Sequence, residues 1–201
     1  MFGSITHEQR IIILFILFIL FILFIMENKI IQASPSHTGS TLLLNLIHGF
    51  LAPAEQIHWK TENKIHNHLI TKTHNTSVDN LIEQFKQYKL WFVMSERNDE
   101  KTCKLIDDKY RKYRRVLIIN YNEINETPSL SLDNIVENIF HKFVKFFPKN
   151  LIPKKDSNAI KLDMKNRVIE MNKVTEEIKS KPFEYWDKFY GVHGSHRNRN
   201  R

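Results

Sequence analysis

The stretch KIIQAS (29–34), followed by PSHTGS (35–40) and TLLLNLIHGF (41–50), decides the fold of this chain. Its first segment is short and almost wholly apolar, which is typical of a strand buried on both faces of a sheet. Apolar residues then recur at helical spacing, which predicts a helix over 40–50. A Ser/Thr/Gly loop between a buried strand and a helix therefore predicts an α/β domain.

The rest of the chain continues this alternation of strands and helices. We expect a P-loop-type, doubly wound parallel sheet of about four strands flanked by helices, because the strand segments are apolar runs rather than alternating patterns. The domain is predicted to span 27–190, followed by a basic tail at 191–201. The further strands are expected at 68–73, 89–95 and 115–121, and the further helices at 77–88, 99–113, 131–147 and 159–179.

The N-terminal segment 1–26 differs from everything after it. Residues 11–26 are entirely apolar and contain Ile-Leu-Phe four times in succession. As a hydrophobic helix this run would be about 24 Å long, against a hydrocarbon core of about 30 Å. Two interpretations stay open: a signal anchor that makes the protein single-pass and membrane-associated, or a spurious extension before a start at Met26, which makes it cytoplasmic.

Composition excludes several classes of protein. The chain has 201 residues, a formal charge of +8 and one cysteine. A single cysteine excludes an intramolecular disulfide framework and a Cys-rich zinc module, and the scattered histidines predict no metal site. The basic run KYRKYRR (109–115) suits RNA, anionic lipid or an acidic polysaccharide, or else forms a solvated face. No specific nucleic acid is expected as a partner.

The loop before the first domain helix is a candidate anion site. Backbone amides, hydroxyls and the positive end of a helix dipole meet there, and all of them favour phosphate or sulfate. Gly39 permits a tight turn, but the loop lacks the first glycine and the lysine of a Walker A motif. The alternative is an ordinary capped helix. The predicted anion-binding residues are Ser36, His37, Thr38, Gly39, Ser40 and Thr41.

Three basic residues follow the next two predicted strands. Lys72 and His74 end the second strand, and Arg97 follows the third. Because the carboxyl ends of parallel strands meet at one edge of a sheet, these side chains should face the same ligand as the loop.

In this order and spacing, the motifs resemble the P-loop sulfotransferases, which use 3′-phosphoadenylyl sulfate as donor. SHTGST (36–41) is similar to their phosphosulfate loop, KTH (72–74) to the segment with their catalytic base, and ERND (96–99) to the segment that binds the 3′-phosphate. YNEI (121–124) matches the turn before their long helix. The resemblance covers roughly 29–147 and implies the same fold and donor, without a metal.

The resemblance also implies roles for single residues. His74 would be the base that deprotonates the acceptor, Lys72 would reach the sulfate, and Arg97 would bind the 3′-phosphate. Two family residues are replaced: His37 stands where the loop lysine belongs, and Leu105 where a serine shares the phosphate contact. His37 is expected to supply the missing charge, and Ser195 and Arg197 of the basic tail the missing phosphate contact.

The function predicted from these residues is sulfuryl transfer to a hydroxyl acceptor, either a small molecule or a glycan. The alternatives are a non-catalytic domain that binds a nucleotide or a sulfated ligand, a nucleotide kinase-like P-loop protein, and a small membrane protein whose domain serves in assembly. They differ in an observable way, because the kinase-like alternative requires binding of ATP that depends on Mg²⁺.

Overall fold

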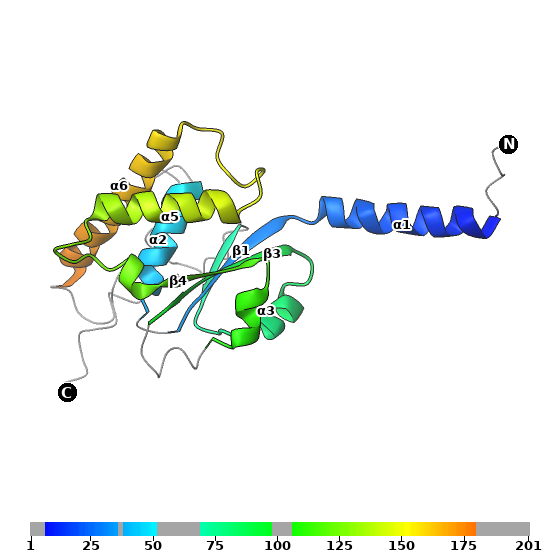
Figure 1. Ribbon diagram of the computed structural model, residues 1–201, viewed down its shortest axis with the longest axis horizontal. Helices are drawn as coiled ribbons and strands as arrows, with labels where there is room; N and C mark the ends of the chain where they lie inside the picture. Colours follow the sequence, from blue (N-terminus) through cyan, green and yellow to red (C-terminus); the bar gives the residue numbers. More distant parts are fainter. Residues whose placement is uncertain (1–6, 36–37, 52–68, 98–105, 180–201) are drawn as a thin grey trace.

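A computed structural model describes residues 7–35, 38–51, 69–97 and 106–179 (Figure 1). Its centre is one parallel sheet of four strands in the order β2-β1-β3-β4. Helices cover both faces, so the predicted α/β class and the parallel sheet are confirmed. The strands are β1 (Asn28–Ala33), β2 (Ile70–Thr73), β3 (Lys89–Glu96) and β4 (Val116–Asn120).

The central strands β1 and β3 consist almost entirely of buried residues. Every residue of β1 after Asn28 is buried, and so are the six inner residues of β3. Strands with two buried faces need helices on both sides, which explains why they carry no polar alternation. In the register, Ile30 lies opposite Ile70 on one side and Trp91 on the other.

The larger core lies on the face covered by α2 (Ser40–Leu51), α5 (Leu132–Phe146) and α6 (Ser157–Lys179). Phe50 is its centre: its ring meets Phe143 edge-on at 5.2 Å and stacks on Phe147 at 5.8 Å between centroids. Such aromatic pairs add about 0.5–1.5 kcal/mol each beyond their buried area. This face therefore supplies much of the stability that holds the strand ends in place.

A glycine sets the distance between α2 and α6. A Cβ on Gly49 would lie 2.5 Å from Cα of Met164, closer than real contacts allow. The two helix backbones therefore touch at this point, and any side chain at position 49 would push α6 away.

The smaller core lies on the opposite face, under α3 (Val78–Gln84) and the 3₁₀ helix η2 (Asp108–Lys112), which packs Tyr110 into it. A second 3₁₀ helix, η3 (Tyr121–Glu123), follows β4, and its Tyr121 packs against the larger core. Two predicted helices are corrected here. The helix expected to end at residue 88 ends at Gln84, because Phe85 and Tyr88 turn inward around the buried ammonium of Lys29, at 5.4 and 5.0 Å. The described part of the helix expected over 99–113 is only a short 3₁₀ turn, capped by Asp107.

The predicted hydrophobic N-terminal helix is present as α1 (His7–Ile25), which projects away from the sheet (Figure 1). Its side chains from Ile11 to Leu17 are between 44% and 65% exposed. Within the residues that the structure describes, none of the helices combines the length and the hydropathy that crossing a membrane takes.

Candidate functional site at the carboxyl edge of the sheet

The predicted anion loop lies where the chain order in the sheet reverses. From β1 the chain passes to β2 on one side and then to β3 on the other, so the loop from 34 to 40 opens between these neighbours. Parallel sheets bind ligands at such a switch point, beyond the carboxyl ends of the strands. Ser36 and His37 lie outside the described residues, whereas Thr38, Gly39, Ser40 and Thr41 lie within them.

Buried hydroxyl groups fasten this loop to β3. Ser34 Oγ accepts hydrogen bonds from Gln32 Nε2 at 2.6 Å and from the Ser95 amide at 2.8 Å. Thr38 donates its hydroxyl proton to the Pro35 carbonyl at 2.7 Å. In its 2.9 Å contact with Ser95 Oγ, Thr38 is therefore the acceptor. All these side chains are fully buried, and their bonds hold the two described ends of the loop, at Ser34 and Thr38, against β3.

Gly39 brings the loop against the residues that follow β4. Its φ is +76°, in the left-handed region that favours glycine. A Cβ there would lie 2.8 Å from Ile124 Cδ1 and 2.9 Å from Tyr121 Cδ2. The Leu43 amide then donates to the Gly39 carbonyl at 2.9 Å, which starts α2 and leaves the first helix amides without a partner inside the helix.

Lys72 reaches from β2 to the start of α2. Its Nζ donates to Thr41 Oγ1 at 3.1 Å, so an ammonium group lies beside the positive end of the helix. Burial lowers the pKa of Lys72 to about 8. No carboxylate of the described residues pairs with this lysine, and an incoming anion would raise its pKa again and so favour the charged form.

His74 is tied to the other end of the loop. Its Nδ1 lies 2.9 Å from the Ser34 carbonyl oxygen, which can only accept a hydrogen bond. Nδ1 must therefore carry the proton, and in the neutral ring Nε2 keeps a lone pair. The side chain is exposed and lies directly after the carboxyl end of β2.

Arg97 shares an aromatic partner with Gly39. Its guanidinium carbon lies 4.3 Å from the centroid of the Tyr121 ring, the same ring that Gly39 approaches. The neighbouring carboxylate of Glu96 bonds Arg111 instead, with Nη1 to Oε1 at 3.0 Å. Tyr121 therefore orients an arginine at the third strand end, next to the loop.

The carboxyl ends of parallel strands meet at one edge of a sheet, and Lys72, His74 and Arg97 accordingly lie at one edge together with the loop. Ser195 and Arg197, predicted to complete the phosphate contact, lie outside the described residues, as does Leu105. In the described parts of the chain, no three His, Cys, Asp or Glu side chains are grouped to hold a metal ion.

Two contributors were missed as site residues by the sequence reasoning. Ser95 holds Thr38, and the Tyr121 ring contacts both Gly39 and Arg97. A polar residue directly after an apolar run within a strand, such as Ser95 after WFVM (91–94), is the signal that could have identified the first.

Comparison with known proteins adds no family: no family model, curated protein or solved structure matches the chain.

Proposed function

We propose that the carboxyl edge of the sheet binds 3′-phosphoadenylyl sulfate and transfers its sulfuryl group to a hydroxyl acceptor. The observation that carries this proposal is that three basic side chains from the ends of two strands, β2 and β3, each contact the loop–helix segment or share a contact with it. Lys72 bonds Thr41, His74 bonds Ser34, and Arg97 shares Tyr121 with Gly39. This geometry suits a ligand that carries anionic groups at two separate points.

The anionic groups of the donor have separate partners. The amides at the start of α2, with Ser40 and Thr41, suit the phosphosulfate, and Lys72 balances the charge that develops on the leaving phosphate. Arg97 suits the 3′-phosphate, because its planar fork can bind two phosphate oxygens at once.

His74 is assigned as the base. Its Nε2 takes the proton of the acceptor hydroxyl while the hydroxyl oxygen attacks the sulfur. The bond between the sulfur and the bridging oxygen then breaks, and 3′-phosphoadenosine 5′-phosphate leaves with the electron pair. The Ser34 carbonyl keeps the ring in the tautomer that this step needs. Because the new and broken bonds lie in line, positioning and charge supply most of the catalysis.

A His74→Ala variant separates binding from transfer. We expect it to bind the donor product as the wild type does and to lose sulfuryl transfer to a panel of phenols, alcohols and sugars. His141→Ala is the matched control, since His141 is exposed on α5 and bonds only Glu137 there. Unchanged transfer in His74→Ala would remove the base from the mechanism.

The remaining alternatives give different results in the same assays. A wild type that binds the donor product but never transfers sulfate is the non-catalytic binding domain. Binding of ATP that requires Mg²⁺, without affinity for the donor product, would identify the kinase-like alternative instead.

A further inference from the structure

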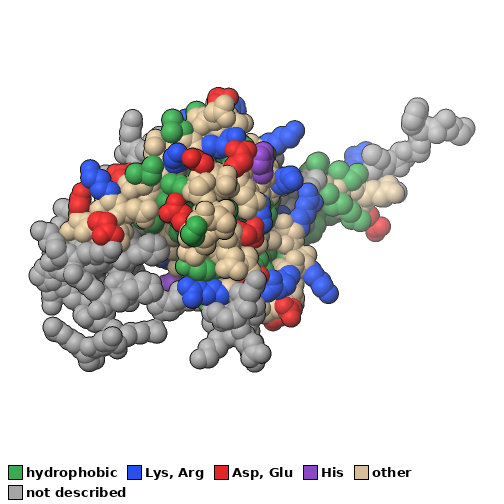
Figure 2. Space-filling model, turned by 60° about the vertical axis from the view of Figure 1, so that its left-hand side comes forward, with side chains coloured by type: hydrophobic (Ala, Val, Ile, Leu, Met, Phe, Trp, Pro, Cys, Tyr) green, Lys and Arg blue, Asp and Glu red, His purple; other side chains and the backbone are tan. Residues whose placement is uncertain are grey.

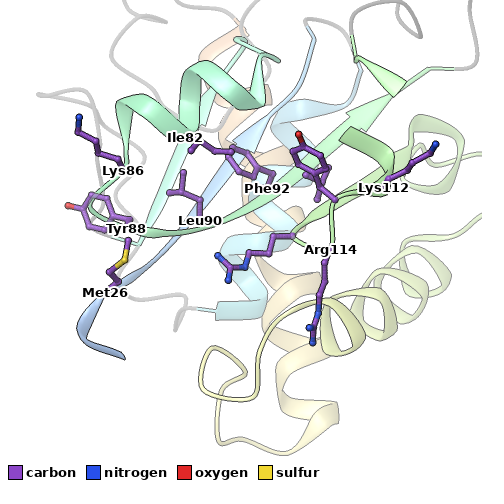
Figure 3. Close-up of a pocket in the computed structure, with 11 residues that line it drawn as sticks. Met26, Ile82, Lys86, Tyr88, Leu90, Phe92, Lys112 and Arg114 are labelled. Atoms are coloured by element: carbon purple, nitrogen blue, oxygen red, sulfur yellow. The ribbon is translucent and has the colours of Figure 1, made fainter. Parts of the chain in front are cut away.

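A second cavity lies away from the carboxyl edge, between α3 and the segment that leads into β4 (Figure 3). It has a volume of about 600 Å³, within the range of about 300–1,000 Å³ that is usual for small-molecule sites. The residues that line it are Met26, Ile82, Lys86, Tyr88, Leu90, Phe92, Lys112, Tyr113, Arg114, Arg115 and Val116.

The floor of this cavity is apolar and belongs to the sheet. Leu90 and Phe92 are alternate residues of β3 and share one face, and Phe92 is paired with Val116 of β4. Figure 3 shows Ile82 of α3 above this floor, between Tyr88 at one end and Lys112 at the other. Ile82 is 43% exposed, so apolar surface continues from the floor to the mouth. A ligand with an apolar body would bury this surface.

The rim carries only positive charge. Four of the lining residues are basic and none is acidic. Lys86 pairs with Glu83 at 2.9 Å, and the Arg115 guanidinium lies 5.6 Å from the Trp91 ring. Lys112 and Arg114 form no ion pair within the described part of the chain, and both are exposed. Lys112 points away from the floor in Figure 3, so the cation that an anionic group at the mouth would meet is Arg114, which has no ion pair among the described residues.

The cavity also adjoins the apolar helix. Met26, which lines it, directly follows α1. In Figure 2, described apolar side chains of α1 project beyond the body of the molecule, and those from Ile11 to Leu17 are exposed. Through Met26, the chain thus connects an exposed apolar segment to an apolar cavity with a basic rim, a combination that suits an anionic amphiphile.

We propose that this cavity binds one anionic amphiphile, with its acyl or aryl body on Leu90, Phe92 and Ile82. Its phosphate, sulfate or carboxylate head contacts Arg114. In this proposal, part of the basic run 109–115 binds an anionic ligand rather than forming only a solvated face. The site is independent of the carboxyl edge, because its floor comes from the beginnings of β3 and β4 and the donor loop lies beyond their ends.

The test is a titration of the full chain with monomeric decyl phosphate, followed by calorimetry. Two variants alter the cavity in different ways. Arg114→Ala removes a cation of the rim, and Ile82→Glu places a carboxylate at the mouth. Their matched controls are Lys154→Ala and Ile169→Glu, exposed residues outside the cavity. All four variants keep α1, so amphiphile that adheres to that helix contributes equally to each.

We expect one site per chain, weakened about tenfold by Arg114→Ala and lost in Ile82→Glu, with both controls like the wild type. Decanol should bind far more weakly than decyl phosphate. Vesicles of phosphatidylglycerol distinguish the source of the ligand: cosedimentation that Arg114→Ala weakens indicates a bilayer lipid, and its absence indicates a free amphiphile. Binding that Arg114→Ala and Ile82→Glu leave unchanged, or equal binding of decanol, would overturn the proposal.

Discussion

The two ends of the sheet use positive charge in opposite ways. At the carboxyl edge, Lys72 and His74 are fixed by hydrogen bonds, and Arg97 is stacked on an aromatic ring around a loop held by buried hydroxyls. At the amino ends of β3 and β4, Lys112 and Arg114 stand exposed around an apolar cavity. The first arrangement suits a compact polyanion, and the second an amphiphile with a single charged head.

This difference teaches that the net charge of +8 is a poor guide to function by itself. What separates the two ends is the surroundings of each cation. Burial lowers the pKa of Lys72, and within the described residues no carboxylate offsets the loss of solvent. Such a perturbed group in a site is typical of function. The exposed cations of the rim keep their hydration, so desolvation costs their charged form little free energy.

The largest effect is expected from Gly39→Val, which attacks the carboxyl edge alone. The valine must adopt a φ of +76° and displace Tyr121 and Ile124, which cost about 1–3 kcal/mol for the backbone before any clash is counted. Binding of the donor product should fall by more than about a hundredfold. Circular dichroism checks that the fold persists, and decyl phosphate should still bind the intact cavity. Undiminished binding of the donor product would contradict the role of the loop.

His48 has a buried imidazole and belongs to neither proposed site, so it tests whether a pKa shift caused by burial is by itself a sign of function. Burial, together with the charge of Arg167, lowers the pKa of His48 to about 4, and its Nδ1 has no hydrogen-bond partner in the described residues. The folded state therefore binds fewer protons than the unfolded state between pH 4 and 6.5, so stability is present above 6.5 and is lost as the pH falls toward 4.

His48→Leu should remove that loss. At pH 5 the wild type should have lost about 2 kcal/mol that the variant keeps, whereas at pH 7 the variant should be equal or slightly more stable. Urea unfolding at the two pH values measures both differences. Ligand binding at either end of the sheet should not change. An equal acid loss in both proteins would show that His48 is not neutral in the fold.

The variant Lys72→Met tests how much one positive charge at the carboxyl edge contributes to binding. Removing one charged hydrogen-bond donor should weaken binding of the donor product by about tenfold. Lys154→Met is the control, since Lys154 is exposed, does not line the cavity and belongs to the connection between α5 and α6. Calorimetry measures both. A loss of the same size in the control would mean that overall charge, rather than the site, attracts the ligand.

A smaller effect should follow from pH. Bound anion favours the charged form of Lys72, whereas the free protein loses that proton as the pH rises through about 8. Binding then takes up a proton, so affinity should fall by about fourfold between pH 7 and 8.5. Lys72→Met should lack this decline. A decline that persists in the variant would assign it to another group.

Much of this fold follows from the sequence. The apolar runs of β1, β3 and β4 and the periodic helices α5 and α6 appear within two residues of their predicted ends. The position of Lys72, His74 and Arg97 at one edge could also be predicted, because the shared direction of parallel strands alone brings their carboxyl ends to the same edge.

The rest depends on contacts between distant segments. Thr38 and Ser95 are 57 residues apart, and their bond depends on a register that no local pattern encodes. The cavity likewise arises only when α3 and the segment before β4 meet over one strand. The short 3₁₀ turn over Asp108–Lys112 differs from the predicted helix because the capping side chain of Asp107 starts a new turn there.

The most direct measurement is a calorimetric titration with 3′-phosphoadenosine 5′-phosphate of the wild type, Arg97→Ala and Arg114→Ala. The two arginines belong to opposite ends of the sheet, so they serve as controls for each other. We predict one binding site in the wild type and in Arg114→Ala, and affinity lower by about tenfold or more in Arg97→Ala. No binding by the wild type at millimolar ligand, or an equal loss in both variants, would contradict a donor site at the carboxyl edge.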